Sequence, residues 1–153
     1  MVQATLPSPI GTILIECDER WITAITIRPD VELEQAVMPG AIARMAVEQL
    51  NAYFAGELKR FDLPVRPLDS PRGEALRAAI CAIPYGHTLS YGGVAQGADS
   101  GPRAIGQACR RNPLPIIVPC HRVTASGGGI GYYSGGKGIE TKYWLLRHET
   151  GHI

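Results

Sequence analysis

The sequence lacks long apolar runs, paired cysteines and internal repeats, and each absence narrows the possibilities. No apolar run approaches the roughly 20 residues that a membrane-spanning helix needs, and no signal-peptide pattern opens the chain. The four cysteines form no C-x-x-C pair, and no histidine lies at zinc-finger spacing, so neither a zinc site nor a disulfide framework is expected. We therefore expect an intracellular, cytoplasmic protein without membrane contact, in a reducing compartment.

The composition describes a globular chain with an uneven charge. Its 153 residues suffice for one domain with a core or for two small lobes, and 45% are hydrophobic and 19% charged. Residues 1–70 contain ten acidic and six basic side chains, whereas residues 71–153 contain nine basic and four acidic ones. The cationic C-terminal half fits a phosphate-binding surface, although an ordinary solvated face explains the charge alone more simply.

The first half of the chain predicts a small α/β lobe. Residues 12–17 alternate apolar and polar side chains and residues 21–27 are rich in β-branched ones, which predicts a hairpin. Apolar residues recur at helical spacing over residues 42–54, and Gly56 ends that pattern. Residues 67–71 are rich in proline and predict a linker. We expect a domain over residues 1–67 and a second over residues 68–153.

The second half predicts a mostly helical domain. Ser70 and Pro71 open one helix, a short helix begins near residues 90–95, and another begins at Pro102 with Ser100 as its candidate N-cap. A helix, a tight turn and a helix form the helix-turn-helix arrangement. From the spacing alone, an αα-hairpin without a ligand is the simpler interpretation.

The stretch from Asn112 to Val123 is the most informative part of the sequence. Prolines bracket the apolar run 116–118, which predicts a buried strand that Pro119 ends, because proline has no N–H to donate. Cys120 would then be held rigidly at the edge of the core, beside His121. A lone cysteine is usually buried and inert, and a nucleophilic thiol needs a pKa below its free value of about 8.5.

Residues 119–123, Pro-Cys-His-Arg-Val, resemble the active-site signature of the O6-alkylguanine-DNA alkyltransferases. The resemblance covers nearly the whole chain. It also rests on Ser90-Tyr91, residues 103–106, Asn112-Pro113, residues 131–136 and residues 144–149. It implies an α/β N-terminal lobe with a small antiparallel sheet and a helix, followed by a mostly α domain with a helix-turn-helix and an active-site loop. It also implies DNA repair by a monomer that transfers an alkyl group once from O6 of guanine, and from O4 of thymine, to Cys120.

The resemblance implies catalytic roles for three residues and needs no cofactor or metal. Cys120 would be the nucleophile, His121 the base acting through a water molecule, and Glu149 the group that orients the imidazole. A damaged base must leave the duplex to be reached. The carbonyls of Cys120 and Val123 would then read the exocyclic amine of guanine.

The remaining roles concern duplex DNA and the substrate pocket. Tyr91 would bind the flipped guanine, and Arg103 would fill the gap it leaves, on a helix that enters the minor groove without sequence preference. Small side chains near Arg103 would let that helix approach the DNA. Other residues would line the substrate pocket. Arg122 would form a structural salt bridge. The small residues are Ala104 and Gly106, and the pocket residues are Asn112, Pro115, Val123, Tyr133 and Ser134.

Two departures and three alternative functions accompany this interpretation. The spacing from Tyr91 to Arg103 is about two residues shorter than in the family, and Cys109 stands where the family usually has an apolar residue. Cys109 is most simply a core residue, although oxidation could join it to Cys120. The alternatives are a lesion-recognition module, a cysteine hydrolase and a helix-turn-helix repressor. A recognition module typically replaces the cysteine, a hydrolase needs an oxyanion hole, and a repressor leaves residues 119–123 unexplained.

Overall fold

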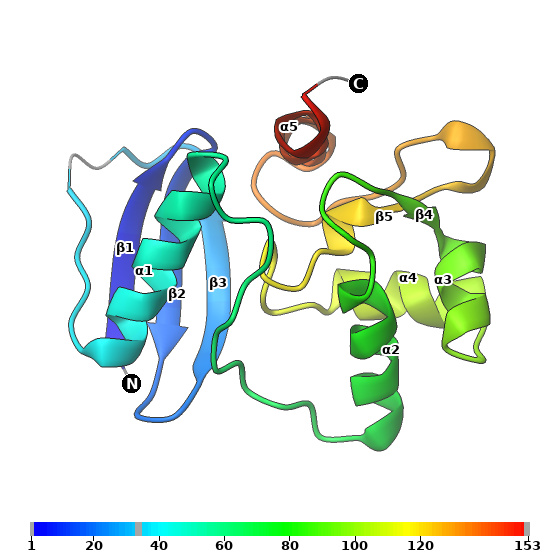
Figure 1. The fold of residues 1–153 in the computed structure, drawn as a ribbon, viewed down its shortest axis with the longest axis horizontal. Helices are drawn as coiled ribbons and strands as arrows, with labels where there is room; N and C mark the ends of the chain where they lie inside the picture. Colours follow the sequence, from blue (N-terminus) through cyan, green and yellow to red (C-terminus); the bar gives the residue numbers. More distant parts are fainter. Residues whose placement is uncertain (1, 33–34, 152–153) are drawn as a thin grey trace. The chain divides into compact units, whose positions relative to one another are not determined.

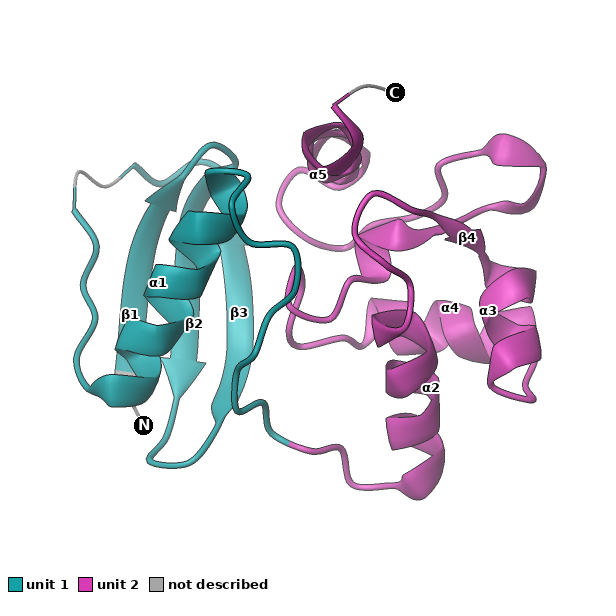
Figure 2. Cartoon of the chain, viewed as in Figure 1, with its two compact units in different colours: residues 1–66 teal, residues 67–153 magenta. Residues whose placement is uncertain are grey.

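The chain forms two compact units, residues 1–66 and residues 67–153 (Figure 2). This computed structural model describes residues 2–32 and 35–151, so the outermost ends of the two predicted domains lie outside the described residues. The units part after Arg66, next to the linker predicted at residues 67–71. None of the described helices is long and apolar enough to cross a membrane.

The first unit is a three-stranded antiparallel sheet with one helix on one face (Figure 1). The strands β1 (Val2–Ser8), β2 (Gly11–Cys17) and β3 (Ile22–Arg28) follow one another in the sheet. The predicted hairpin is β2 and β3, whereas β1 was not predicted, because Pro7 and Pro9 are residues that favour a turn. Pro7 instead pairs with Thr12, at an edge strand where a missing N–H is tolerated.

Apolar packing between the sheet and α1 (Ala41–Phe54) stabilises the first unit. Alternate residues of β2 point inward, and α1 contributes a buried stripe at spacings of three and four residues. Each fully buried aliphatic side chain contributes about 1.5–3 kcal/mol. The stripe consists of Ala43, Ala46, Val47, Leu50 and Tyr53.

Helix caps define the helices of the second unit. The helices α2 (Pro71–Cys81) and α3 (Tyr91–Gly97) begin after Ser70 and Ser90, and each serine Oγ accepts a backbone N–H three residues on, at 2.9 and 3.0 Å. The helix α4 (Pro102–Arg110) begins after Gly101 without a side-chain cap. The predicted Ser100 cap is wrong, because its hydroxyl instead accepts from Arg72 Nη2 at 2.8 Å.

A short parallel pairing brings the start of α3 to the segment that follows Cys120. The strand β4 (Leu89–Ser90) pairs with β5 (Val123–Thr124), and α3 packs on α4. The 3₁₀ turns η1 (Cys120–Arg122) and η2 (Ser126–Gly128) flank β5, and α5 (Ile139–Thr150) contacts η1. Distant parts of the sequence therefore meet around η1 (Figure 1).

Candidate active site

A buried turn, not the predicted strand, leads to Cys120. Ile116 has a φ of 75°, and the Val118 N–H donates to the carbonyl of Leu114 at 2.9 Å. The surrounding prolines remove the donors that a strand would need, so the apolar run folds back on itself. Leu114, Ile116 and Val118 are nevertheless buried, which holds the turn rigidly in the core.

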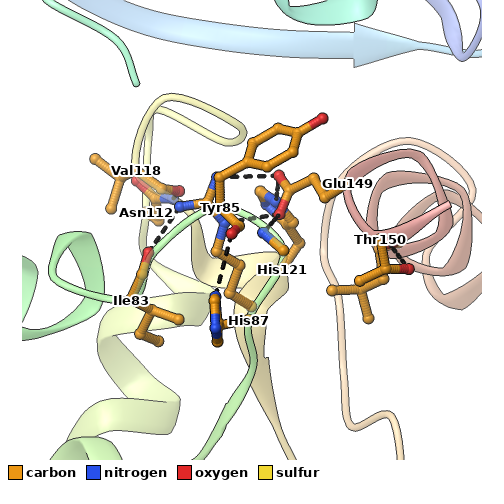
Figure 3. Close-up of polar contacts among 11 residues, drawn as sticks. Ile83, Tyr85, His87, Asn112, Val118, His121, Glu149 and Thr150 are labelled. Atoms are coloured by element: carbon orange, nitrogen blue, oxygen red, sulfur yellow. Dashed lines mark hydrogen bonds and ion pairs between the residues drawn. The ribbon is translucent and has the colours of Figure 1, made fainter. Parts of the chain in front are cut away.

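Asn112, directly after α4, fastens the turn to the thiol. Its Nδ2 lies 3.1 Å from the carbonyl oxygen of Val118 and 3.3 Å from Cys120 Sγ, and its Oδ1 accepts the Leu114 N–H at 3.0 Å. One amide thus spans the end of α4, the turn and the cysteine (Figure 3 shows its bond to Val118). Cys120 itself is only 5% exposed.

Burial raises the pKa of the Cys120 thiol above its ordinary value. The bond from Asn112 and the positive charge of Lys142 oppose this rise but do not cancel it. The expectation of a lowered pKa is therefore wrong for the resting protein, since the sequence does not reveal how completely the sulfur is desolvated. Cys120 is a neutral thiol at neutral pH and needs a base to become nucleophilic.

His121, which follows Cys120 in η1, forms a buried pair with Glu149 of α5. His121 Nε2 lies 2.6 Å from Glu149 Oε2, and both side chains are fully buried (Figure 3). Burial lowers the pKa of His121 and outweighs the carboxylate, so the imidazole is neutral near pH 7. With Nε2–H donating to Glu149, Nδ1 is the acceptor nitrogen, and it has no hydrogen-bond partner among the described residues.

Arg122 keeps Glu149 ionised. Its Nε and Nη2 donate to the two carboxylate oxygens at 2.8 and 3.1 Å, and its Nη1 donates to the carbonyl of Ile83 at 2.8 Å. Burial alone would raise the pKa of Glu149, but the hydrogen bonds from His121 and Arg122, the charge of Arg122 and that of His121 once it is protonated lower it to about 2. Glu149 is therefore a fixed negative charge that orients the imidazole.

Lys142 is a site residue that the sequence prediction missed. Its Nζ is buried and donates to the carbonyls of Val123 at 2.6 Å and Tyr132 at 3.0 Å. A lysine on a surface helix usually suggests a solvated face. The available signal was its spacing, because Lys142, Leu145 and Glu149 recur at helical positions and form one buried face of α5.

An open groove of about 680 Å³ contains most of the residues predicted to face DNA. Tyr91, Arg103 and Gly106 line it, and Arg103 is exposed. Ala104 does not face this groove but lines a separate cavity of about 360 Å³ between α2 and α4. Six further residues line the groove, namely Pro102, Gln107, Arg110, Ala125, Ser126 and Tyr132.

The predicted pocket residues differ in exposure. Tyr133 is buried, its hydroxyl has no partner among the described residues, and it interacts electrostatically with Cys120. The carbonyl of Val123 already accepts from Lys142, Ser134 is exposed, and Pro115 lies inside the buried turn.

Cys109 is buried near Cys120. Burial, reinforced by the Cys120 sulfur once it is ionised, raises the pKa of the Cys109 thiol to about 12. Cys109 is therefore protonated at neutral pH, as expected of a core residue. Within residues 2–32 and 35–151, no three His, Cys, Asp or Glu side chains gather as a metal-binding set.

Two family models match the chain. The 6-O-methylguanine DNA methyltransferase, ribonuclease-like domain, matches residues 1–67, and the DNA binding domain of the same name matches residues 73–151. Two curated relatives are matched over nearly their whole length. The methylated-DNA–protein-cysteine methyltransferase of Methanosarcina acetivorans is 38% identical over 97% of this chain and 98% of its own, and that of Bacillus subtilis, named constitutive, is 36% identical over 95% and 93%.

Solved structures agree with these matches. Mycobacterium tuberculosis OGT in complex with DNA superposes with a TM-score of 0.80 at 36% identity, covering 96% of this chain and 92% of that one. The O6-methylguanine methyltransferase of the same organism gives 0.81 over 97% and 92%. The expected fold class is confirmed by this similarity. The chain belongs to the methylated-DNA–protein-cysteine methyltransferase family.

Proposed function

We propose that this protein repairs DNA by transferring an alkyl group, above all methyl, from O6 of guanine to Cys120. The observation that carries the proposal is the arrangement around the thiol. Asn112 donates toward Sγ, and a neutral His121 is anchored by Glu149 and keeps its Nδ1 free to accept a proton. Cys120 and His121 are buried neighbours in η1 and Glu149 binds the imidazole, which supplies a nucleophile, a base and an orienting group.

The reaction begins with loss of the Cys120 proton. Because the thiol is neutral in the resting protein, its proton passes to His121 Nδ1, by way of a water molecule. The resulting imidazolium is stabilised by Glu149, 2.6 Å from the other ring nitrogen. Arg122 prevents Glu149 from taking up the proton itself, because it holds the carboxylate ionised.

Displacement at the alkyl carbon follows. The sulfur lone pair forms the S–C bond while the C–O6 bond breaks, and the electrons of the broken bond pass to the guanine ring. The guanine takes up one proton and the His121 imidazolium gives up the proton that came from Cys120, so the overall reaction neither consumes nor releases a proton. Tyr91 is suited to donate a hydrogen bond to the base, because burial raises the pKa of its hydroxyl and keeps it protonated. The thioether formed is stable, so each molecule acts once and needs no cofactor.

DNA binding is assigned to residues 68–153, and residues 1–67 carry no chemistry in this proposal. Duplex DNA binds with its minor groove against the protein groove that Tyr91, Arg103 and Gly106 line. A base must be extruded, at a cost of a few kcal/mol, and the exposed Arg103 fills the vacated stack. Contacts to phosphate are independent of sequence. O4-alkylthymine fits the same chemistry as a second substrate, and one protein molecule suffices for the reaction.

Mass mapping tests the proposed function. The protein is incubated with a duplex containing O6-methylguanine and digested, and methylated peptides are located. One methyl group per protein, on Cys120, is expected, with none in Cys120→Ala and an unchanged yield in the matched variant Cys109→Ser. Binding without an adduct would instead indicate a recognition module, and repeated turnover of an ester or amide would indicate a hydrolase.

A further inference from the structure

The pocket loop, residues 125–138, follows the reactive cysteine and contains several glycines with left-handed backbone. Side chains from two other elements contact the backbone in the middle of the loop, at residues 131–132. Lys142 Nζ donates to the carbonyl of Tyr132 at 3.0 Å, and the Tyr91 hydroxyl lies against the backbone of the neighbouring Gly131. At Gly131, a Cβ would lie 3.1 Å from the Tyr91 oxygen and 3.3 Å from Lys142 Nζ, so the backbone must come this close for both contacts. Tyr132 therefore sets the position of the loop beside the buried Tyr133.

A third contact fastens the side chain of Tyr132 from outside. The guanidinium of Arg110, in the last turn of α4, lies 4.9 Å from the centroid of the Tyr132 ring. Tyr132 is 51% exposed, and Arg110 is exposed as well. Arg110 has no hydrogen bond or ion pair among the described residues, and residues 100–139 contain no acidic side chain. The ring is thus the partner that holds this cation in the free protein.

The same guanidinium is placed to bind a DNA phosphate. Arg110 and Tyr132 line the groove that also contains Tyr91, Arg103 and Gly106. An exposed cation–π contact is weak, whereas arginine and phosphate form strong bidentate hydrogen bonds. A phosphate that lies beyond the reach of the stacked guanidinium draws it off the ring, and in that geometry phosphate binding and the ring contact compete.

We propose that Arg110 and Tyr132 form a latch that holds the pocket loop closed in the free protein and that the DNA backbone opens. A phosphate in the groove withdraws the Arg110 guanidinium from the ring, and the glycine-rich loop then loses this contact with α4 while its contacts with Lys142 and Tyr91 remain. The loop is loosened when DNA is bound, which is when a base must enter. This inference rests on the proposed function, because it assigns the groove to duplex DNA.

The affinity for an undamaged duplex tests the latch, because it requires no alkyl transfer. If the ring contact must break on binding, Tyr132→Ala binds a fluorescent unmodified duplex about 2- to 5-fold more tightly than the wild type. Tyr132→Phe keeps the ring and leaves the affinity unchanged, as does the matched control Tyr143→Ala, which removes an exposed tyrosine of α5. Arg110→Ala binds more weakly, and adding Tyr132→Ala to it gives no further change.

Two outcomes would overturn the latch alone. Weaker binding by Tyr132→Ala would make Tyr132 a DNA contact, and an unchanged affinity would mean that the ring does not compete. Hydrogen exchange of a peptide from the loop gives an independent measurement: Arg110→Ala and Tyr132→Ala raise its exchange severalfold, whereas Arg111→Ala, on the neighbouring exposed arginine, does not. Equal exchange in all variants also overturns the latch. A wild type that binds no duplex would overturn the proposed function as well.

Discussion

The two units differ in what they bury. In the described part of residues 1–66, the buried side chains are apolar except for Thr12. The second unit buries an arginine, a histidine, a lysine and a glutamate around Cys120, although desolvating charges is unfavourable. The difference teaches that the interior of the first unit serves stability, whereas that of the second also holds ionisable groups in place. The buried polar and charged side chains in the described part of the second unit are those of Arg77, His121, Arg122, Thr141, Lys142 and Glu149.

Removing the central carboxylate gives the largest expected effect. Glu149→Ala leaves Arg122 and His121 buried without their partner, so we expect the free energy of unfolding to fall by about 3–5 kcal/mol. Glu48→Ala, an exposed glutamate on α1 of the first unit, is the matched control and should change it by less than about 0.5 kcal/mol. Urea denaturation measures both. An equally small decrease in the free energy of unfolding in Glu149→Ala and Glu48→Ala would contradict the contrast between the units.

A core truncation in the first unit should separate stability from chemistry. Leu50 is fully buried on α1, and Leu50→Ala should lower the free energy of unfolding by about 2–5 kcal/mol. Below the denaturation midpoint, the single-turnover rate on an O6-methylguanine duplex should equal that of the wild type. A slower transfer by the folded variant would show that the first unit takes part in the reaction.

The low pKa of Glu149 predicts how stability depends on pH. Its pKa falls from an ordinary value of 4.5 to about 2 in the folded protein, so on acidification the unfolded state binds the proton first. The stabilisation, about 3 kcal/mol, is complete above about pH 5 and is lost as the pH falls toward about 2. Denaturation curves over this range should show that the free energy of unfolding falls more steeply with decreasing pH in the wild type than in Glu149→Gln. Equal slopes would contradict an ionised, paired carboxylate.

Lys142 gives the smallest of the expected stability effects but a specific kinetic signature. Lys142→Met leaves the carbonyls of Val123 and Tyr132 without their donor, at about 1–3 kcal/mol. It also removes a charge that lowers the pKa of Cys120, so the pH profile of single-turnover transfer should move to higher pH. Lys137→Met, at an exposed position of the pocket loop, should leave the profile in place. A profile that does not move in Lys142→Met would contradict this electrostatic role.

Local rules predicted the elements that depend on local chemistry. The α1 stripe follows helical spacing, and α2 begins after Ser70 because the serine caps it. The strand β1 was not predicted, because proline favours turns and only pairing with β2 makes the segment around Pro7 a strand. The run before Cys120 was predicted as a strand, because the left-handed backbone of Ile116 depends on the surrounding turn.

The candidate site was predicted from a resemblance, but its electrostatics were not. The resemblance implied that Cys120, His121 and Glu149 act together, and the structure brings the last two into contact. The direction of the thiol pKa was wrong, because desolvation depends on every atom packed around the sulfur. Lys142 was missed for the same reason, since its buried partners are backbone carbonyls from distant segments.

The ionisation state of Cys120 tests most directly the claim that a buried, neutral thiol relies on His121 as its base. An NMR titration of the Cβ resonance of isotope-labelled cysteine, assigned with Cys120→Ala, measures this state in the free protein. We predict a thiol that stays protonated at neutral pH and titrates above the ordinary cysteine value, in a protein that still transfers methyl from duplex DNA at that pH. A Cys120 thiolate at neutral pH in the free protein would contradict the account.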